Sequence, residues 1–96
     1  MKIALLNTPN QLLPIRCKGH LIEFWLHQFR GNLYCTTRID GEYISGAVKV
    51  SVGMNLLSYP LWEKRYGQFI FRNKYDTAVT DYESYNDAVY LEYTDV

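Results

Sequence analysis

Hydrophobic and polar residues alternate along most of this 96-residue chain, and each alternating stretch is short. The clearest stretch spans residues 20–27. Its period of two predicts one face formed by His20, Ile22, Phe24 and Leu26 and an opposite face formed by Leu21, Glu23, Trp25 and His27. No segment shows the sustained 3.6-residue period of an amphipathic helix. The pattern therefore predicts a chain built mainly from strands.

Turn residues mark where these strands end. Lys18-Gly19 and Asp40-Gly41 are two-residue hairpin turns, and the second is the strongest hairpin signal in the chain. A loop centred on Gly31 separates two further strands, and Gly46 inside a strand indicates a bulge or a close backbone approach. The strands predicted in this way are 11–17, 20–27, 33–39, 42–52, 68–72 and 87–94, and residues 3–6 are a candidate for a seventh.

Two segments do not fit the strand pattern. Residues 61–66 predict either one helical turn or a loop, and residues 73–86 are polar and predict a long loop. Six or seven short antiparallel strands indicate an all-β fold, either a small single-domain β-sandwich or a partly open β-barrel. A chain of this length forms one domain, so residues 1–96 are expected to fold as a single unit.

The cysteines and histidines leave three interpretations open. Cys17 and Cys35 fit two separate reduced thiols that pack as small hydrophobic residues, the usual case inside cells. A disulfide between them is the alternative in an oxidising compartment. A zinc site formed by both cysteines with His20 and His27 is the third, but their spacing matches no known zinc finger. We therefore expect no metal and no cofactor.

The sequence does not bring catalytic residue types together. The six glycines are scattered at turns rather than gathered in a phosphate-binding loop, and no nucleophile elbow surrounds any of the four serines. Glu23 and His27 share a strand face but lie about 13 Å apart along it. The sequence therefore predicts no catalytic residues and a protein that is not an enzyme.

The apolar runs of the chain are short. They extend for only a few residues, far below the roughly 20 residues of a membrane-spanning helix. Asn7, Pro9 and Asn10 interrupt the N-terminal apolar residues too early for a signal-peptide core. We expect a soluble chain that is neither secreted nor membrane-bound.

Equal numbers of basic and acidic residues conceal an uneven distribution. All ten basic residues but only four acidic ones lie in residues 1–74, so that this part carries +6 and residues 75–96 carry −6. Either the two parts form oppositely charged surfaces that orient the domain between unlike partners, or the acidic segment packs beside the basic one and cancels it.

One segment combines basic and aromatic residues as single-stranded nucleic-acid platforms do. Lys64, Arg65, Arg72 and Lys74 alternate there with Trp62, Tyr66, Phe69, Phe71 and Tyr75. A net charge of zero and a pI near 6.7 argue against general nucleic-acid binding. Binding of single-stranded nucleic acid is therefore only an alternative function.

Tyrosine is abundant, with nine residues, and several of them lie in the acidic segment. Tyrosine has a large rigid ring with a polar tip and is enriched at protein interfaces. A small domain with more aromatic surface than its core can hold buries that surface against partners. The residues predicted to contact partners lie in the least core-like segments and are Trp62, Lys64, Arg65, Tyr66, Tyr82 and Tyr85.

The order of these motifs resembles that of the small baseplate plug proteins of contractile-tailed phages, over almost the whole chain. The matching motifs are Pro9-Asn10-Gln11, Lys18-Gly19, the strand 21–27, Leu33-Tyr34-Cys35, Asp40-Gly41 with Gly46, Asn55-Leu56-Leu57, Gly67-Gln68-Phe69 and Val89-Tyr90-Leu91-Glu92-Tyr93. The chain departs from the family at Tyr34, where a tryptophan is usual, and at residues 62–66, which are more basic.

The resemblance implies a structural virion protein of the tail baseplate, present in the host cytoplasm during assembly. Such a plug lies where hub, spike and tube meet, and it helps to close the channel. Its implied partners are those tail proteins, with copies arranged in three-fold or six-fold symmetry, and neither a membrane nor nucleic acid is expected. A single-stranded nucleic-acid-binding β-barrel and a small phage-encoded inhibitor of a host enzyme are the alternatives.

Overall fold

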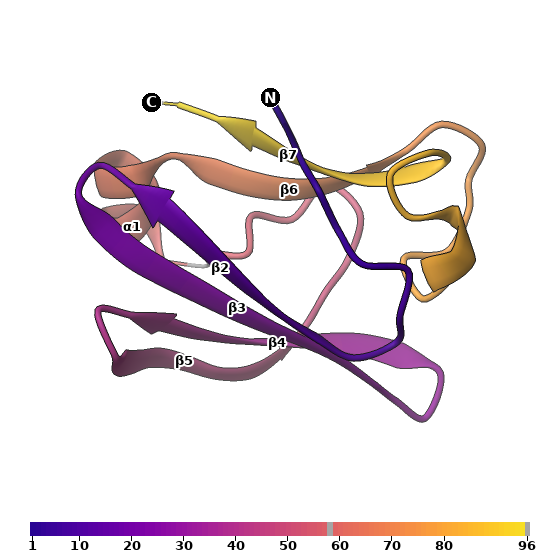
Figure 1. The fold of residues 1–96 in the computed structure, drawn as a ribbon, viewed down its shortest axis with the longest axis horizontal. Coiled ribbons are helices and arrows are strands. Elements are labelled where there is room, and N and C mark those ends of the chain that lie inside the picture. The colour runs from indigo at the N-terminus through magenta and orange to yellow at the C-terminus, as the bar shows by residue number, and fades with distance from the viewer. Residues whose placement is uncertain (58, 96) are drawn as a thin grey trace.

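A computed structural model describes residues 1–57 and 59–95, whose strands form two antiparallel sheets (Figure 1). The elements in chain order are β1 (Lys2–Ile3), β2 (Gln11–Cys17), β3 (His20–Phe29), β4 (Asn32–Ile39), β5 (Glu42–Lys49), α1 (Pro60–Tyr66), β6 (Gln68–Asn73), the 3-10 turn η1 (Tyr82–Ser84) and β7 (Val89–Thr94). The larger sheet has the order β2-β3-β4-β5 and the smaller one β1-β7-β6. The predicted all-β sandwich is therefore confirmed.

Three two-residue turns connect the larger sheet into a meander. Lys18-Gly19, Arg30-Gly31 and Asp40-Gly41 each have positive φ at both residues, between 50° and 86°. Two consecutive positive φ angles are the backbone of the hairpin turns that match the natural twist of paired strands. The loop expected around Gly31 is therefore a tight turn, and β3 continues to Phe29 where the sequence predicted an end near His27.

The fourth strand of this sheet is bulged. The β4–β5 register shifts between the pairs Cys35–Val48 and Thr37–Ser45, and Gly46 lies within the extra residues on β5. This confirms the bulge predicted from Gly46. The strand ends at Lys49 rather than at the predicted residue 52.

The smaller sheet joins the two ends of the chain. β1 pairs with β7, so the predicted seventh strand exists but covers Lys2–Ile3 rather than residues 3–6. The outer edge of β6 receives backbone hydrogen bonds from Gly53 N to Phe71 O, at 3.0 Å, and from Leu56 N to Phe69 O, at 2.8 Å. The segment before α1 thus covers that edge.

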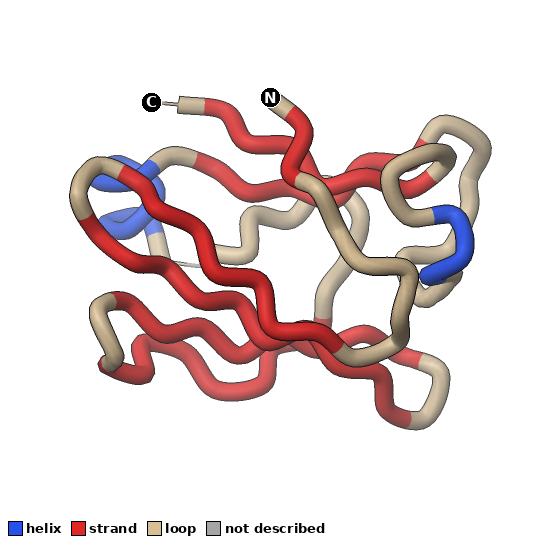
Figure 2. Tube along the Cα trace, viewed as in Figure 1, coloured by secondary structure: helices blue, strands red, loops and turns tan. Residues whose placement is uncertain are grey.

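The core lies between the two sheets, which Figure 2 shows as two layers of strands. Ile22, Phe24 and Leu26 of β3 are at most 1% exposed, as the alternation predicted. The Phe24 and Phe69 rings meet edge to face with centroids 5.0 Å apart. The remaining large contributors are Leu33, Leu57, Tyr66, Phe71, Val89 and Leu91. Cys17 and Cys35 are free and buried, and no group of three potential metal ligands forms within residues 1–57 and 59–95.

Helix α1 and the turn η1 lie at opposite ends of the sandwich (Figure 2). Of the two alternatives for residues 61–66, the helix is correct. Pro60 begins it, as suits a residue with fixed φ and no amide hydrogen. Gly67 ends it at φ 101°, and a Cβ there would lie 2.6 Å from the carbonyl oxygen of Thr94. Only glycine fits this close approach.

The predicted long loop between β6 and β7 contains η1 and is held by hydrogen bonds. Asn7 Nδ2 donates to Tyr82 O at 3.0 Å and to Tyr85 O at 3.1 Å. Gln28 Nε2 donates to Thr80 O at 2.7 Å. These bonds fix the loop against both the N-terminal segment and β3. No helix in the described part of the chain is long and apolar enough to cross a membrane.

Candidate interaction face

The structure separates the six residues predicted to contact partners into three groups. Lys64 and Arg65 lie on the exposed side of α1, where contact with a partner stays a prediction. Trp62 and Tyr82 are half-buried and pack against the core. Tyr66 and Tyr85 are only 2% and 3% exposed, so their interpretation as surface residues is wrong.

Specific contacts explain why these two tyrosines are core residues. The ring of Tyr66 stacks on Trp62 and meets the His20 ring in a T-shaped contact. The Tyr85 hydroxyl donates to Val79 O at 2.6 Å, and burial raises its pKa to about 12. Both residues lie at the end of a turn of helix that faces the sandwich, an orientation that local composition does not encode.

The segment proposed as a nucleic-acid platform does not present its aromatic residues on one open surface. Phe69 and Phe71 are fully buried between the sheets, as is Tyr66. Of the basic residues, Arg72 pairs with Glu92, with Nε and Oε1 3.6 Å apart. In β6, Phe69 and Phe71 therefore face the core, whereas Arg72, the one basic residue of this strand, lies on its other side.

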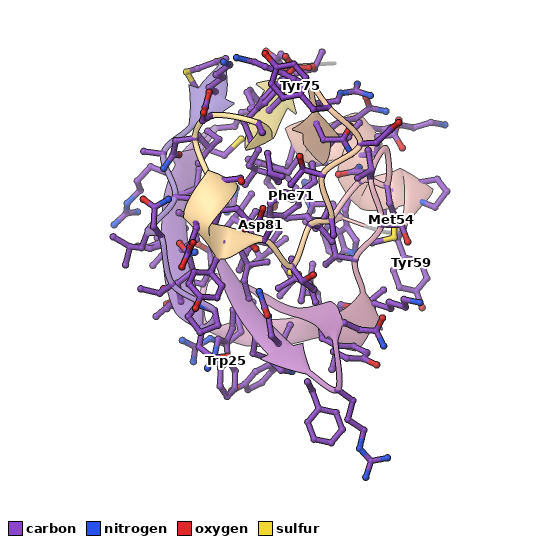
Figure 3. The ribbon with its side chains drawn as sticks, turned by 90° about the vertical axis from the view of Figure 1, so that its right-hand side faces the viewer. Trp25, Met54, Tyr59, Phe71, Tyr75 and Asp81 are labelled. Atoms are coloured by element: carbon purple, nitrogen blue, oxygen red, sulfur yellow. The ribbon has the colours of Figure 1, made fainter. Side chains whose placement is uncertain are left out.

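The uneven charge distribution is partly cancelled by folding. Strand β7 brings Glu92 beside Arg72, and Asp95 pairs with Lys18 at 2.7 Å. Four acidic residues remain together in the loop 75–87, which we call the acidic loop, and they are Asp76, Asp81, Glu83 and Asp87. Figure 3 views this end of the molecule, with Asp81 near its centre. Folding thus cancels part of the charge separation, and an orienting role for the remaining acidic residues stays a prediction.

The most prominent exposed aromatic surface is the outer side of the larger sheet. Its members alternate with the core residues of β2 to β5, and we call it the aromatic face: Leu12, Trp25, His27, Tyr34 and Tyr43. Leu12, Trp25 and Tyr43 are 52%, 51% and 69% exposed. Trp25 lies directly between Leu12 of β2 and Thr36 of β4, at the middle of the sheet.

Two shallow hollows meet at Trp25. The first, of about 260 Å³, is lined by Leu12, Glu23, Trp25, Thr36, Arg38 and Tyr43. The second, of about 540 Å³, is lined by Asn10, Trp25, His27, Gln28, Phe29, Tyr34 and Ala47. Trp25 therefore forms a ridge that a partner would contact from both sides.

Ring contacts hold the aromatic face in one arrangement. The His27 ring stacks on Tyr34 with centroids 5.9 Å apart and lies 5.3 Å from the Trp25 ring. Its Nδ1 atom is buried and has no hydrogen-bond partner among the described residues. A rigid aromatic side chain loses little conformational entropy when a partner covers it.

An ion pair borders the first hollow. Arg38 Nη2 lies 3.1 Å from Glu23 Oε2, and the Arg38 guanidinium also lies 5.4 Å from the centre of the Tyr43 ring. Arg16 and Lys49 extend from the same outer side, on β2 and β5, and both are exposed. The formal charges of Arg16, Arg38, Lys49 and Glu23 sum to +2.

The alternation correctly placed Trp25 and His27 on one face of their strand, opposite Ile22, Phe24 and Leu26, but did not identify them as a site. The available signal was the presence of large aromatic residues on the polar face of consecutive strands, where small polar residues are usual. Tyr34 and Tyr43 continue that row, because they pair with His27 and Arg38 across the sheet. A row of this kind becomes visible only when the register is known.

Two other groups with shifted pKa values lie away from this face. A hydrogen bond from His20, 2.5 Å away, and one from the Leu21 amide lower the pKa of Asp40. Burial raises the pKa of the Cys35 thiol to about 12. The His20–Asp40 pair connects two hairpin turns, and Cys35 lies in the core.

The fold and this face together define a small β-sandwich with an exposed row of aromatic side chains on one sheet. Comparison of the sequence with models of known protein families and with curated proteins gave no match.

Proposed function

We propose that this protein is a structural component of a contractile phage tail baseplate, a plug located where hub, spike and tube meet. The observation that carries the proposal is the aromatic face. Trp25 is half-exposed at the centre of a rigid sheet, with Leu12 and Tyr43 exposed beside it. Aromatic residues that are fixed in shape and central in a patch provide most of the binding energy at protein interfaces.

The resemblance to the baseplate plug proteins supplies the biological setting. Its motifs fall on the elements that the fold requires of them: Lys18-Gly19 and Asp40-Gly41 form the hairpin turns, and Gly46 lies in the bulge of β5. Gly67 leads into β6, and residues 89–93 lie in β7. An assembly protein of this kind needs turns and packing but no reacting groups, in keeping with the predicted absence of catalysis.

In this role the protein acts by non-covalent packing. The aromatic face is covered by neighbouring subunits, and copies of the chain surround the tail axis in three-fold or six-fold symmetry. The resulting ring closes the channel before contraction. The nucleic-acid alternative is less well supported, because Phe69 and Phe71 are not available for base stacking.

Affinity capture from the native source tests the proposal. The tagged protein is recovered from lysate, and the co-purifying proteins are identified by mass spectrometry. We expect tube, hub and spike proteins together, and we expect Trp25→Ala to lose them. Tyr59→Ala is the matched control, because Tyr59 is 60% exposed but lies outside the aromatic face. Recovery of a single host enzyme at equal stoichiometry, or of nucleic acid, contradicts the proposal.

A further inference from the structure

We propose that the neighbour covering the aromatic face is a second copy of this chain, which presents its acidic loop. This inference rests on the proposed role of the aromatic face as an assembly surface, but not on the phage setting. The two surfaces belong to the same molecule and are complementary in charge and in the kind of side chain that they expose.

The aromatic face is the electropositive partner. Arg16 and Lys49 are exposed at its two margins and form no ion pair with any described residue. Arg38 is already paired with Glu23, and Arg16 lies near enough to Asp40 to contribute to the lowered pKa of that carboxyl, but neither Arg16 nor Lys49 forms a direct ion pair among the described residues. Between these two margins lie the hollows on either side of Trp25.

The acidic loop is the electronegative partner. Its four carboxylates are all exposed, and none of them forms an ion pair with a residue that the structure describes. Tyr75 at the start of the loop is 75% exposed, among the highest values for the large hydrophobic residues. The loop therefore offers both negative charge and an aromatic side chain to the face of another copy.

The acidic loop has a fixed shape before any contact. Lys74 N donates to Ala88 O at 2.8 Å, which closes the loop at its base. Asn73 Nδ2 donates to Thr77 O at 3.2 Å, and the Ser84 hydroxyl donates to Asp81 at 2.8 Å. Since the loop is already ordered, its docking requires little loss of conformational entropy.

A copy cannot make this contact with itself. In Figure 3, Tyr75 lies at the top of the loop end of the molecule and Trp25 at its lower edge. The loop is anchored at its middle by Gln28 and Asn7 and does not cover the outer side of the larger sheet. The loop of one copy therefore meets the face of the next, which is a head-to-tail contact. Repeated contacts of this type form closed rings or open chains.

Charge reversal with recombination tests the inference on the purified, isolated protein. The loop variant carries Asp81→Lys and Glu83→Lys, and the face variant carries Arg16→Glu and Lys49→Glu. The control variant carries Lys2→Glu, which reverses an exposed charge on β1 outside both surfaces. Sedimentation velocity measures self-association, and heteronuclear NMR spectra of each variant confirm that it is folded.

We expect the wild-type protein to exceed its monomer mass of 11.3 kDa as concentration rises, and to dissociate as ionic strength rises. The loop variant and the face variant are each expected to associate about tenfold more weakly or worse. A mixture of the two is expected to associate again, because the positive loop of one now meets the negative face of the other. The Lys2→Glu control is expected to behave as the wild type.

Two spectroscopic signals locate the contact. On dilution, the indole resonance of Trp25 and the amides of the acidic loop are expected to shift together, whereas the indole of Trp62 stays unchanged. A wild-type protein that is monomeric at every concentration and at low ionic strength overturns the inference. So does a mixture of variants that fails to associate, or a dilution effect centred on Trp62.

The outcomes for this inference and for the proposed function are separable. A protein that is monomeric but captures tube, hub and spike proteins keeps its baseplate function and loses the self-contact. A protein that self-associates through Trp25 and the acidic loop, but captures no tail protein, keeps the self-contact and loses the baseplate function.

Discussion

Tyr85 and Trp25 provide the sharpest contrast between a core aromatic residue and an interface aromatic residue in this chain. Tyr85 is 3% exposed, packs with its ring centre 6.0 Å from that of Phe71, and donates its hydroxyl to Val79 O at 2.6 Å. Trp25 is 51% exposed and lies outside the core. Replacing each by alanine is therefore expected to affect different properties of the protein.

Tyr85→Ala is expected to lower the free energy of unfolding by about 3–5 kcal/mol, the usual cost of removing a buried aromatic ring. The whole domain is expected to be stable by about 5–14 kcal/mol, so that a large share of its stability is lost. The melting temperature is expected to fall by about 15–30 °C. Tyr85→Phe retains the ring but leaves Val79 O without its donor, with an expected loss of about 1–2 kcal/mol.

Trp25→Ala is expected to cost about 1 kcal/mol or less in stability, because half of the side chain is already exposed to water. Urea denaturation followed by far-UV circular dichroism measures all three variants and gives the midpoint and slope for each. Tyr85→Ala that unfolds no more easily than Trp25→Ala would contradict the core position of Tyr85 and the surface position of Trp25. Equal midpoints for Tyr85→Phe and the wild type refute the contribution of the Val79 hydrogen bond.

Three further predictions concern the turns and the core. Gly67→Ala is expected to destabilise the fold by about 2 kcal/mol or more through its positive φ and its clash with the last strand, whereas Gly46→Ala, in open space, stays within about 0.5 kcal/mol in the same denaturation assay. Because the pKa of Asp40 is lowered by folding, its contribution to stability is complete above about pH 4 and lost as the pH falls through the folded value. Asp40→Asn is therefore expected to flatten the decline of the denaturation midpoint below pH 4, and an unchanged decline contradicts this. In a Cys17→Ser background, the Cys35 thiol, with its pKa raised to about 12, is expected to resist iodoacetamide at pH 8 until denaturant is added; labelling at the rate of a free thiol, measured by mass spectrometry, opposes the prediction.

The local sequence pattern was sufficient to predict most of the strands and turns of this protein. Strand β3 shows this most clearly, since the alternation around Phe24 correctly separated the buried Ile22, Phe24 and Leu26 from the opposite face with Trp25. The residue types alone likewise predicted a hairpin turn at Asp40-Gly41 and a bulge at Gly46. The boundaries were less accurate, as at β1 and β5, because pairing determines where each strand ends: β1 pairs with the distant strand β7, and the register of β5 against β4 is shifted by the bulge.

The candidate site could not be predicted in the same way, because it depends on contacts between residues that are distant in the sequence. Tyr66 and Tyr85 occur in segments without a clear period, and their burial follows from packing against residues on other elements. The aromatic face could not be predicted for a different reason. Each of its strands showed Trp25, Tyr34 or Tyr43 on the outer side, but their union into one surface required the register of the whole sheet.

The central claim is that this chain is built into a tail through its aromatic face, and incorporation into particles tests it most directly. Contractile tails are purified on a density gradient from the native source after the chain is replaced by tagged wild-type protein or by Trp25→Ala. We predict that the wild-type chain co-sediments with tube and hub proteins at a constant ratio, and that the variant, although folded, stays in the soluble fraction. Purified tails that lack the wild-type chain, or that incorporate the variant equally well, contradict the account.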